Sequence, residues 1–179
     1  MRSRSARNSG VHRRHGTCPD RHLAATLTEA DTSRVFTGSV VDPFSDMTSG
    51  LTLEELEAAI RVSWSLETCD PTDVAEWTPS NPSRGQCAVT ALVIHDVFGG
   101  QLLEAEVHLR DGSRQGFHYW NRLAGVDVDL TRGQFASHEI VQEPHEIDRT
   151  PETPWRAHEQ YLLFRSRVHA ALLTQLPDP

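Results

Sequence analysis

An almost unbroken apolar run, Cys-Ala-Val-Thr-Ala-Leu-Val-Ile, occupies the middle of the chain from Cys87 to Ile94. The chain enters this run through Gly85-Gln86, and Gly99-Gly100 follows at a helical length, where glycine commonly ends helices. A helix that is apolar on every side must be covered on every side. The pattern therefore predicts a buried helix over about residues 85–98, enclosed by other elements of the chain.

A second helix is predicted upstream, over about residues 52–64. Thr52 and Glu55 have the spacing of a capping box, in which each side chain accepts a hydrogen bond from the other residue's backbone N–H. Apolar residues then recur at helical spacing at Leu53, Leu56, Ile60 and Trp64. The segment between the two helices, residues 67–83, contains three prolines and is predicted to be a long irregular loop.

The hydrophobic period changes after Gly100, from helical spacing to the alternation that is typical of strands. We expect three antiparallel strands, over residues 101–108, 116–121 and 126–130. The polar stretch over about residues 136–152 is predicted to be loop.

The last predicted element is a helix that begins at Thr153-Pro154, a favourable pair for the N-cap and the first helical position, and runs to about Leu176. Its apolar stripe consists of Trp155, Leu162, Leu163, Val168, Leu172 and Leu176. The order of elements predicts an α+β fold, in which the buried cysteine-bearing helix packs on a small antiparallel sheet between N- and C-terminal helices.

The N-terminal segment differs in composition from the rest of the chain. Ser, Arg, Gly, His and Thr dominate residues 1–46, which we predict to be a disordered extension, native or introduced by an upstream start site. Met47 then opens a stretch that is suitable for the start of a folded unit. Residues 47–179 are expected to form a single domain, long enough to bury a core.

Charge is distributed unevenly along the chain, which has 17 basic residues, all of them arginine. Residues 1–46 carry seven arginines against five acidic residues, whereas residues 47–179 carry ten against twenty. Nucleic-acid binding requires clustered cations, so an acidic domain without a basic stripe is not expected to bind DNA or RNA.

Membrane insertion and secretion are not expected either. No window approaches the length of apolar sequence that a membrane span requires, and the N-terminus lacks the apolar segment of a secretory signal. Three scattered cysteines, Cys18, Cys69 and Cys87, do not suggest a disulfide framework. We therefore expect a cytoplasmic protein with reduced thiols.

Cys87 is the first candidate for chemistry. Ser83 and Gln86 have capping-box spacing, and with Ser83 as the N-cap, Cys87 lies in the first turn of the buried helix. The unpaired backbone N–H groups and the positive end of the helix dipole favour a thiolate there, as expected for a nucleophile. The alternative is an inert core cysteine, which is the usual role of a lone cysteine in an apolar helix.

A nucleophilic cysteine needs a base, usually a histidine, and a group that orients the base. His95 is eight residues further along the same helix, about 12 Å away, and cannot reach Cys87. His118 is the better choice, because it lies on a strand among Phe117, Tyr119 and Trp120, whose rings could shield an ion pair from water.

Asp127 and Asp129 share one face of the next strand and are the candidates for orienting the base. With residues 122–125 as a four-residue loop, His118 is opposite Asp129 and Trp120 is opposite Asp127. We favour Asp129, although a shift of the pairing by two residues would exchange the roles of the two aspartates. Both could also simply lie on a solvated face.

A zinc site is a second enzymatic possibility. Its ligands would come from Cys87, His108, His118, Asp127 and Asp129. None of the usual metal-binding spacings, such as C-x-x-C or H-E-x-x-H, occurs, so neither a metal nor another cofactor is expected.

Several segments resemble the YunG-type family of small bacterial proteins. They are residues 64–68 (Trp-Ser-Leu-Glu-Thr), 81–92 (Asn-Pro-Ser-Arg-Gly-Gln-Cys-Ala-Val-Thr-Ala-Leu), 99–100 (Gly-Gly), 118–121 (His-Tyr-Trp-Asn) and 128–135 (Val-Asp-Leu-Thr-Arg-Gly-Gln-Phe). More distantly, a cysteine at a helix start, then a histidine before an aromatic residue, then Asp-x-Thr is similar to the transglutaminase-like branch of the papain-like superfamily. The separation of His118 and Asp129 is shorter than in that superfamily, and the sheet is smaller.

The papain-like resemblance implies acyl transfer. Cys87 would be the nucleophile, His118 the base and Asp129 the orienting group. The backbone N–H of Cys87 would be one oxyanion donor, and the side-chain amide of Gln86 or Asn81 the second. Asn81 and Gln86 have an ordinary alternative role as turn and cap residues.

The sequence therefore leads to two hypotheses about function. The first is a Cys-His-Asp acyl-transfer enzyme that acts on an amide or thioester in a peptide or other substrate, as a hydrolase, a deamidase or an amide-forming transferase. The second is a non-catalytic papain-like binding or immunity module in which Cys87 belongs to the core.

Overall fold

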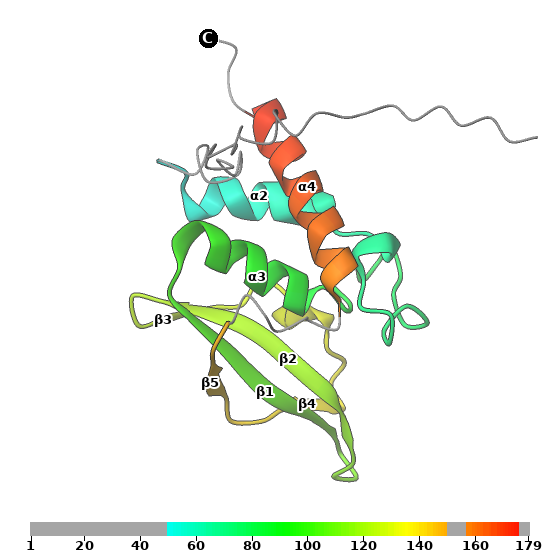
Figure 1. Cartoon of the computed structure of the whole chain (residues 1–179). Coiled ribbons are helices and arrows are strands. Elements are labelled where there is room, and N and C mark those ends of the chain that lie inside the picture. Colours follow the sequence, from blue (N-terminus) through cyan, green and yellow to red (C-terminus); the bar gives the residue numbers. More distant parts are fainter. Residues whose placement is uncertain (1–49, 150–156, 176–179) are drawn as a thin grey trace, which may run out of the picture. The chain divides into compact units, whose positions relative to one another are not determined.

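The computed structural model describes residues 50–149 and 157–175 of the 179-residue chain. The predicted disorder of residues 1–46 and the predicted helix start at Thr153-Pro154 lie outside these residues. The fold is α+β, as predicted: in the described part, three α-helices lie on one side of an antiparallel sheet. Figure 1 shows helix α3 between the sheet and a layer formed by α2 and α4.

Helix α3 (Cys87–Phe98) is the buried helix that the apolar run predicts. All of its residues from Cys87 to Ile94 are buried, because it contacts β1 and β2 on one side and α4 on the other. Its start corrects the predicted cap. Gln86 is the N-cap, without a side-chain cap bond, and Ser83 instead donates a hydrogen bond to Asn81 at 3.3 Å. Gly85 explains the difference, because its φ of +68° interrupts a helical path from Ser83.

Helix α2 (Leu53–Ser63) forms as predicted. The capping box is complete: Glu55 N donates to Thr52 Oγ1 at 3.2 Å, and Thr52 N donates to Glu55 Oε2 at 2.8 Å. Its apolar face, Leu56, Ala59 and Ile60, is fully buried, and the helix packs against α4. The segment that follows contains a short 3-10 helix, η1 (Leu66–Thr68), and then irregular turns as far as α3, in agreement with the predicted loop.

Two long strands, β1 (Gln101–Leu109) and β2 (Arg114–Leu123), form a hairpin at the predicted places. The loop predicted over residues 136–152 is partly wrong. It contains β4 (Glu139–Val141) and β5 (His145–Ile147), which both pair with β1. Strands of three residues are too short to show alternation, so their pairing depends on the free edge that β1 offers.

The pairing of β2 with β3 (Val126–Val128) differs from the predicted register. Asn121 is opposite Val128, which leaves a two-residue turn at Ala124 and Gly125 in place of the four-residue loop. Both turn residues have positive φ, +48° and +83°, as a tight hairpin turn requires. Alanine rarely adopts that conformation, so the sequence gives no sign of the turn.

The buried stripe of helix α4 (His158–Gln175) was predicted only in part. Val168 and Leu172 are buried, but Leu162 and Leu163 are 50% and 38% exposed. Tyr161 and Phe164 take their place, so that the buried residues recur at steps of three and four along the helix. The predicted stripe residues Trp155 and Leu176 lie outside the described residues. No helix within the described ranges is long and apolar enough to cross a membrane.

Candidate functional site

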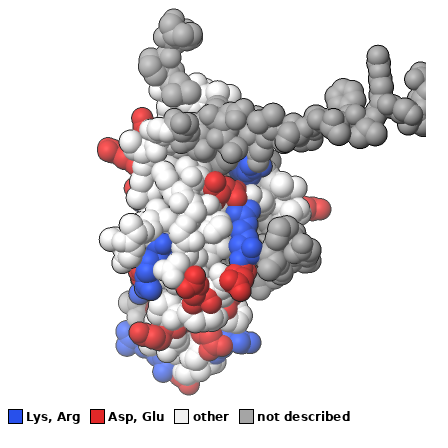
Figure 2. Space-filling view, turned by 60° about the vertical axis from the view of Figure 1, so that its left-hand side comes forward, with Lys and Arg blue, Asp and Glu red and all other residues white. Residues whose placement is uncertain are grey.

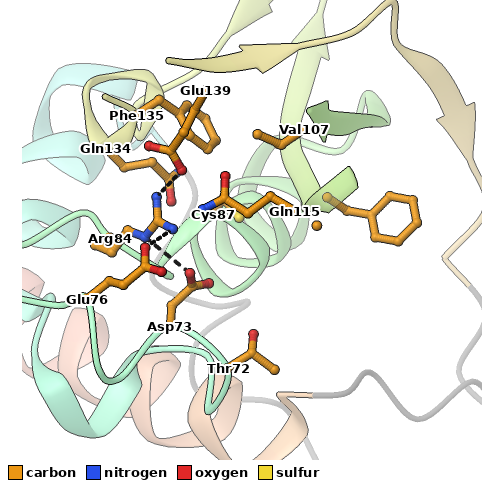
Figure 3. A pocket seen from close by; sticks show the side chains of 12 residues that line it. Thr72, Asp73, Glu76, Arg84, Cys87, Val107, Gln115, Gln134, Phe135 and Glu139 are labelled. Carbon is orange, nitrogen blue, oxygen red and sulfur yellow. Dashed lines mark hydrogen bonds and ion pairs between the residues drawn. The ribbon is translucent and has the colours of Figure 1, made fainter. Parts of the chain in front are cut away.

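Cys87 is the first residue of α3 and lines a cavity of about 180 Å³. The cavity lies between the loop that precedes α3, the strands β1 and β2, and the segment after β3 (Figure 3). The side chain of Cys87 is 9% exposed. Because the first backbone N–H groups of a helix have no partner within the helix, this position favours negative charge on or near the sulfur.

The turn that delivers Cys87 to the cavity requires glycine at position 85. In addition to the positive φ, a Cβ atom on Gly85 would lie 2.5 Å from Cys69 Sγ and 2.7 Å from Asp73 Cβ. The backbone of the turn is fixed further by the bond from Asp70 N to Gly85 O, at 2.8 Å. Any other residue at position 85 would have to displace the segment that precedes the cysteine.

His118 lies on β2 and is completely buried. Trp120 stacks on its ring, with ring centroids 5.2 Å apart, and Phe135 packs its edge at 4.8 Å. Aromatic rings therefore shield the imidazole, as predicted for Trp120, and Phe135 was not anticipated.

The three residues predicted as a triad meet in the structure. His118 Nε2 lies 2.7 Å from Asp129 Oδ2, and Cys87 lies close enough to the His118 side chain to affect its pKa. Burial by itself would lower the pKa of His118. The hydrogen bond to Asp129, the proximity of Cys87 and the negative charges of both groups outweigh burial and raise this pKa to about 9.

Asp129 reaches His118 although the predicted register is wrong. It follows directly after β3, where its nominal position is opposite Trp120, and it contacts His118 on the diagonal. Thr131 orients the carboxylate, because its N–H and Oγ1 both donate to Asp129 Oδ1, at 3.2 and 3.3 Å. The Asp-x-Thr sequence thus fixes one oxygen and leaves the other for the imidazole.

Asp127 has different partners. It accepts hydrogen bonds from Arg122 Nε at 2.5 Å and from Trp120 Nε1 at 3.2 Å. It therefore holds the indole that stacks on His118, but it does not contact the imidazole in any described hydrogen bond. In the described part of the site, Asp127 is therefore linked to His118 only through Trp120.

The two amides predicted as oxyanion donors are engaged elsewhere. Gln86 is completely buried, accepts a hydrogen bond from Thr68 Oγ1 at 2.9 Å and donates to Ser65 O at 2.7 Å. Asn81 Nδ2 donates to the backbone oxygen of Gln134 at 2.9 Å. Gln86 thus joins the two ends of the loop before α3, and Asn81 joins this loop to the segment after β3.

Gln134 was not predicted as a site residue. It lies in a 3-10 helix, η2 (Arg132–Gln134), is 4% exposed and lines the cavity together with Cys87. Its Nε2 is 3.3 Å from His118 Nδ1, and its Oε1 accepts a hydrogen bond from Gly85 N at 3.2 Å. Its position within the family-like segment 128–135 was the only sign of it in the sequence.

Arg84 was also not predicted. Its side chain is 6% exposed, and its guanidinium is surrounded by three carboxylates in the cavity wall (Figure 3): Glu139 at 2.7 Å, Asp73 at 3.1 Å and Glu76. Burial would lower the pKa of Arg84, but the bond to Glu139 and the three negative charges raise it. Three carboxylates against one guanidinium leave the described wall of the cavity with an excess of negative charge.

The five residues considered as zinc ligands do not form one cluster. His108 Nε2 pairs with Glu106 at 2.7 Å, and Asp127 binds Trp120 and Arg122. Within the described ranges, no group of three or more His, Cys, Asp or Glu side chains could hold a metal ion.

The face shown in Figure 2 carries basic and acidic side chains interspersed, without a continuous basic stripe.

Comparison with known proteins gives one family and one relative. The sequence profile of the family described as "YunG protein" matches residues 52–173, which include all the site residues above. A protein of Bacillus subtilis (strain 168) with the name "Uncharacterized protein YunG" is 36% identical over 83 residues, which make up 46% of this chain. The chain covers 63% of that relative's length. No solved structure matches.

Proposed function

The chain belongs to the YunG family, and on that premise we propose that it is a cysteine-dependent acyl-transfer enzyme, with Cys87 as nucleophile, His118 as acid and base, and Asp129 as orienting carboxylate. Its substrate would be an amide or a thioester. One observation carries the proposal: a fully buried imidazole, hydrogen-bonded to Asp129, whose pKa is raised to about 9 by Asp129 and the nearby Cys87. A purely structural core cysteine needs no such partner.

The reaction would begin with transfer of the Cys87 proton to His118. The thiolate attacks the substrate carbonyl carbon, the C–S bond forms, and the carbonyl oxygen becomes an oxyanion. On collapse, the bond to the leaving nitrogen or sulfur breaks, and the imidazolium donates its proton to the leaving group. Water or an amine, deprotonated by His118, then attacks the acyl-enzyme and releases the Cys87 sulfur.

Within this proposal, Asp129 keeps the imidazole in one orientation and stabilises its positive charge. The order of the three residues, cysteine at a helix start, histidine on a strand and aspartate just after the next strand, supports a papain-like or transglutaminase-like core as part of the proposal. The substrate would reach Cys87 through the cavity that this residue lines.

The test is alkylation with iodoacetamide from about pH 5 to about pH 9, with the modified cysteine identified by peptide mass spectrometry. We expect fast modification of Cys87 well below the usual titration range of a thiol, about 8.5, and loss of this fast phase in His118→Ala. Cys87→Ser should show no fast phase.

Cys69 provides the matched control. It is 1% exposed, and burial together with the charges of Asp73 and Asp70 raises its pKa to about 12, so Cys69→Ser should react like the wild type. Alkylation of Cys87 only under unfolding conditions would refute the enzyme proposal and leave the alternative, a binding module with an inert core cysteine.

A further inference from the structure

Gln134 connects the two halves of the proposed site through one side-chain amide. Its Oε1 accepts a hydrogen bond from Gly85 N, just before Cys87, and its Nε2 lies 3.3 Å from His118 Nδ1. The Gly85 bond fixes which end of the amide faces the imidazole. With the amide reversed, its NH₂ group would face the Gly85 N–H, donor against donor.

The contact with His118 depends on where the proton is. His118 Nε2 is committed to Asp129, so Nδ1 is the nitrogen that can exchange a proton with the Cys87 sulfur. Gln134 can donate to Nδ1 only while Nδ1 carries no proton. Once the sulfur has given its proton to Nδ1, the Gln134 N–H group loses that acceptor.

The freed N–H group belongs to a residue that lines the cavity with Cys87, where the substrate oxyanion develops. Gln86 and Asn81 hold other partners, so neither amide is available there without breaking existing bonds. We propose that Gln134 Nε2 is the side-chain donor of the oxyanion hole, together with the backbone N–H of Cys87. This inference rests on the acyl-transfer function proposed above.

The donor is thus coupled to the state of the nucleophile. In the neutral state Gln134 holds the imidazole, and in the ion-pair state it becomes free to bind the carbonyl oxygen. Such a donor contributes to a step that forms an oxyanion, and contributes little to a step that forms none. This difference separates an oxyanion role from a merely structural one.

Two reagents test the difference on the full-length protein. Iodoacetamide alkylates the sulfur by substitution at a saturated carbon, without an oxyanion. 4-Nitrophenyl acetate acylates it through a tetrahedral oxyanion, with formation of the thioester and release of 4-nitrophenolate. For Gln134→Ala we expect acylation to slow by about 10²- to 10³-fold, the usual cost of losing one such donor, with alkylation near the wild-type rate.

Two further variants keep the test decisive. Gln134→Glu retains an acceptor for Gly85 N–H but has no N–H donor, so its acylation should also be slow. Gln115→Ala removes another glutamine from the same cavity and should leave the ratio of the two rates unchanged.

The outcomes separate the two proposals. If wild-type Cys87 reacts slowly with both reagents, the acyl-transfer function itself is wrong. If the wild type reacts rapidly with both, and the Gln134 variants slow both reactions equally or neither, then only the oxyanion role of Gln134 is refuted.

Discussion

Replacing Asp129 with asparagine isolates the charge that holds His118 in its protonated state. Asparagine keeps an oxygen acceptor in the same place, opposite an Nε2 that lies 2.7 Å from the carboxylate, but it removes the negative charge. A hydrogen bond to a charged group contributes about 1.5–3 kcal/mol, against about 0.5–1.5 kcal/mol for a neutral one. The difference, about 1–1.5 kcal/mol, corresponds to a change of about 1 in pKa. We therefore expect the pKa of His118 to fall from about 9 to about 8.

The assay is an NMR titration of the imidazole nitrogens from about pH 6 to about pH 10. The His118 resonances can be assigned from their absence in His118→Ala. Asp127→Asn is the matched control, because Asp127 binds Trp120 and Arg122 and has no described hydrogen bond to the imidazole; its effect on the titration should be small. A His118 titration that is the same in Asp129→Asn as in the wild type would contradict the assigned contact and the reasoning from charge.

Three further results are expected. Gly85→Ala should lower the free energy of unfolding in urea by at least about 1–2 kcal/mol, because alanine must adopt a left-handed conformation and its Cβ would lie 2.5 Å from Cys69 Sγ. An unchanged urea midpoint would contradict the close approach of residue 85 to Cys69. At low salt, Cys87 should react roughly tenfold faster with the cationic 2-aminoethyl methanethiosulfonate than with its anionic 2-sulfonatoethyl analogue, after correction for their rates with free cysteine, because three carboxylates surround Arg84 in the cavity. Glu76→Gln should reduce this preference, and equal rates for the two reagents in the wild type would contradict the inferred charge. Phe164→Ala should destabilise the fold by about 3–5 kcal/mol in the same denaturation assay, since the ring is fully buried where α4 enters the core; a loss well below this range would mean that the site collapses to fill the space.

Local sequence rules account well for the helical part of the fold. The capping box at Thr52 and Glu55 places the start of α2, and the apolar run together with Gly99 places α3 and its cysteine. These signals act over three or four residues or along one helix, so that they can be recognised in the sequence alone. The buried face of α4 was harder to assign, because apolar residues lie on more than one of its sides.

The contact between His118 and Asp129 was predicted, but the way in which the chain forms it was not. His118 and Asp129 were paired through a four-residue loop, whereas the turn has two residues and the contact is diagonal. The wrong loop length still led to the right aspartate, because side chains two residues apart on a strand share a face.

Gln134 and Arg84 show what sequence patterns could not reveal. Their key partners are far away along the chain: Gln134 binds Gly85 across 49 residues, and Arg84 binds Glu139 across 55. No periodicity or motif spacing connects such positions. They become neighbours only because the loop before α3 and the segment after β3 meet beside the cysteine.

The complete burial of His118 beneath Trp120 and Phe135 also restricts the order of events in the proposed reaction. Because Trp120 and Phe135 cover the ring, bulk water has no direct route to the imidazole. An incoming acceptor can reach the imidazole from the cavity beside Cys87. The departing product and the attacking acceptor would occupy the same place, beside the acyl carbon on Cys87. The first product would therefore leave before the acceptor binds. This order predicts double-displacement kinetics, in which the acyl-enzyme persists between the departure of the first product and the arrival of the acceptor through the same cavity.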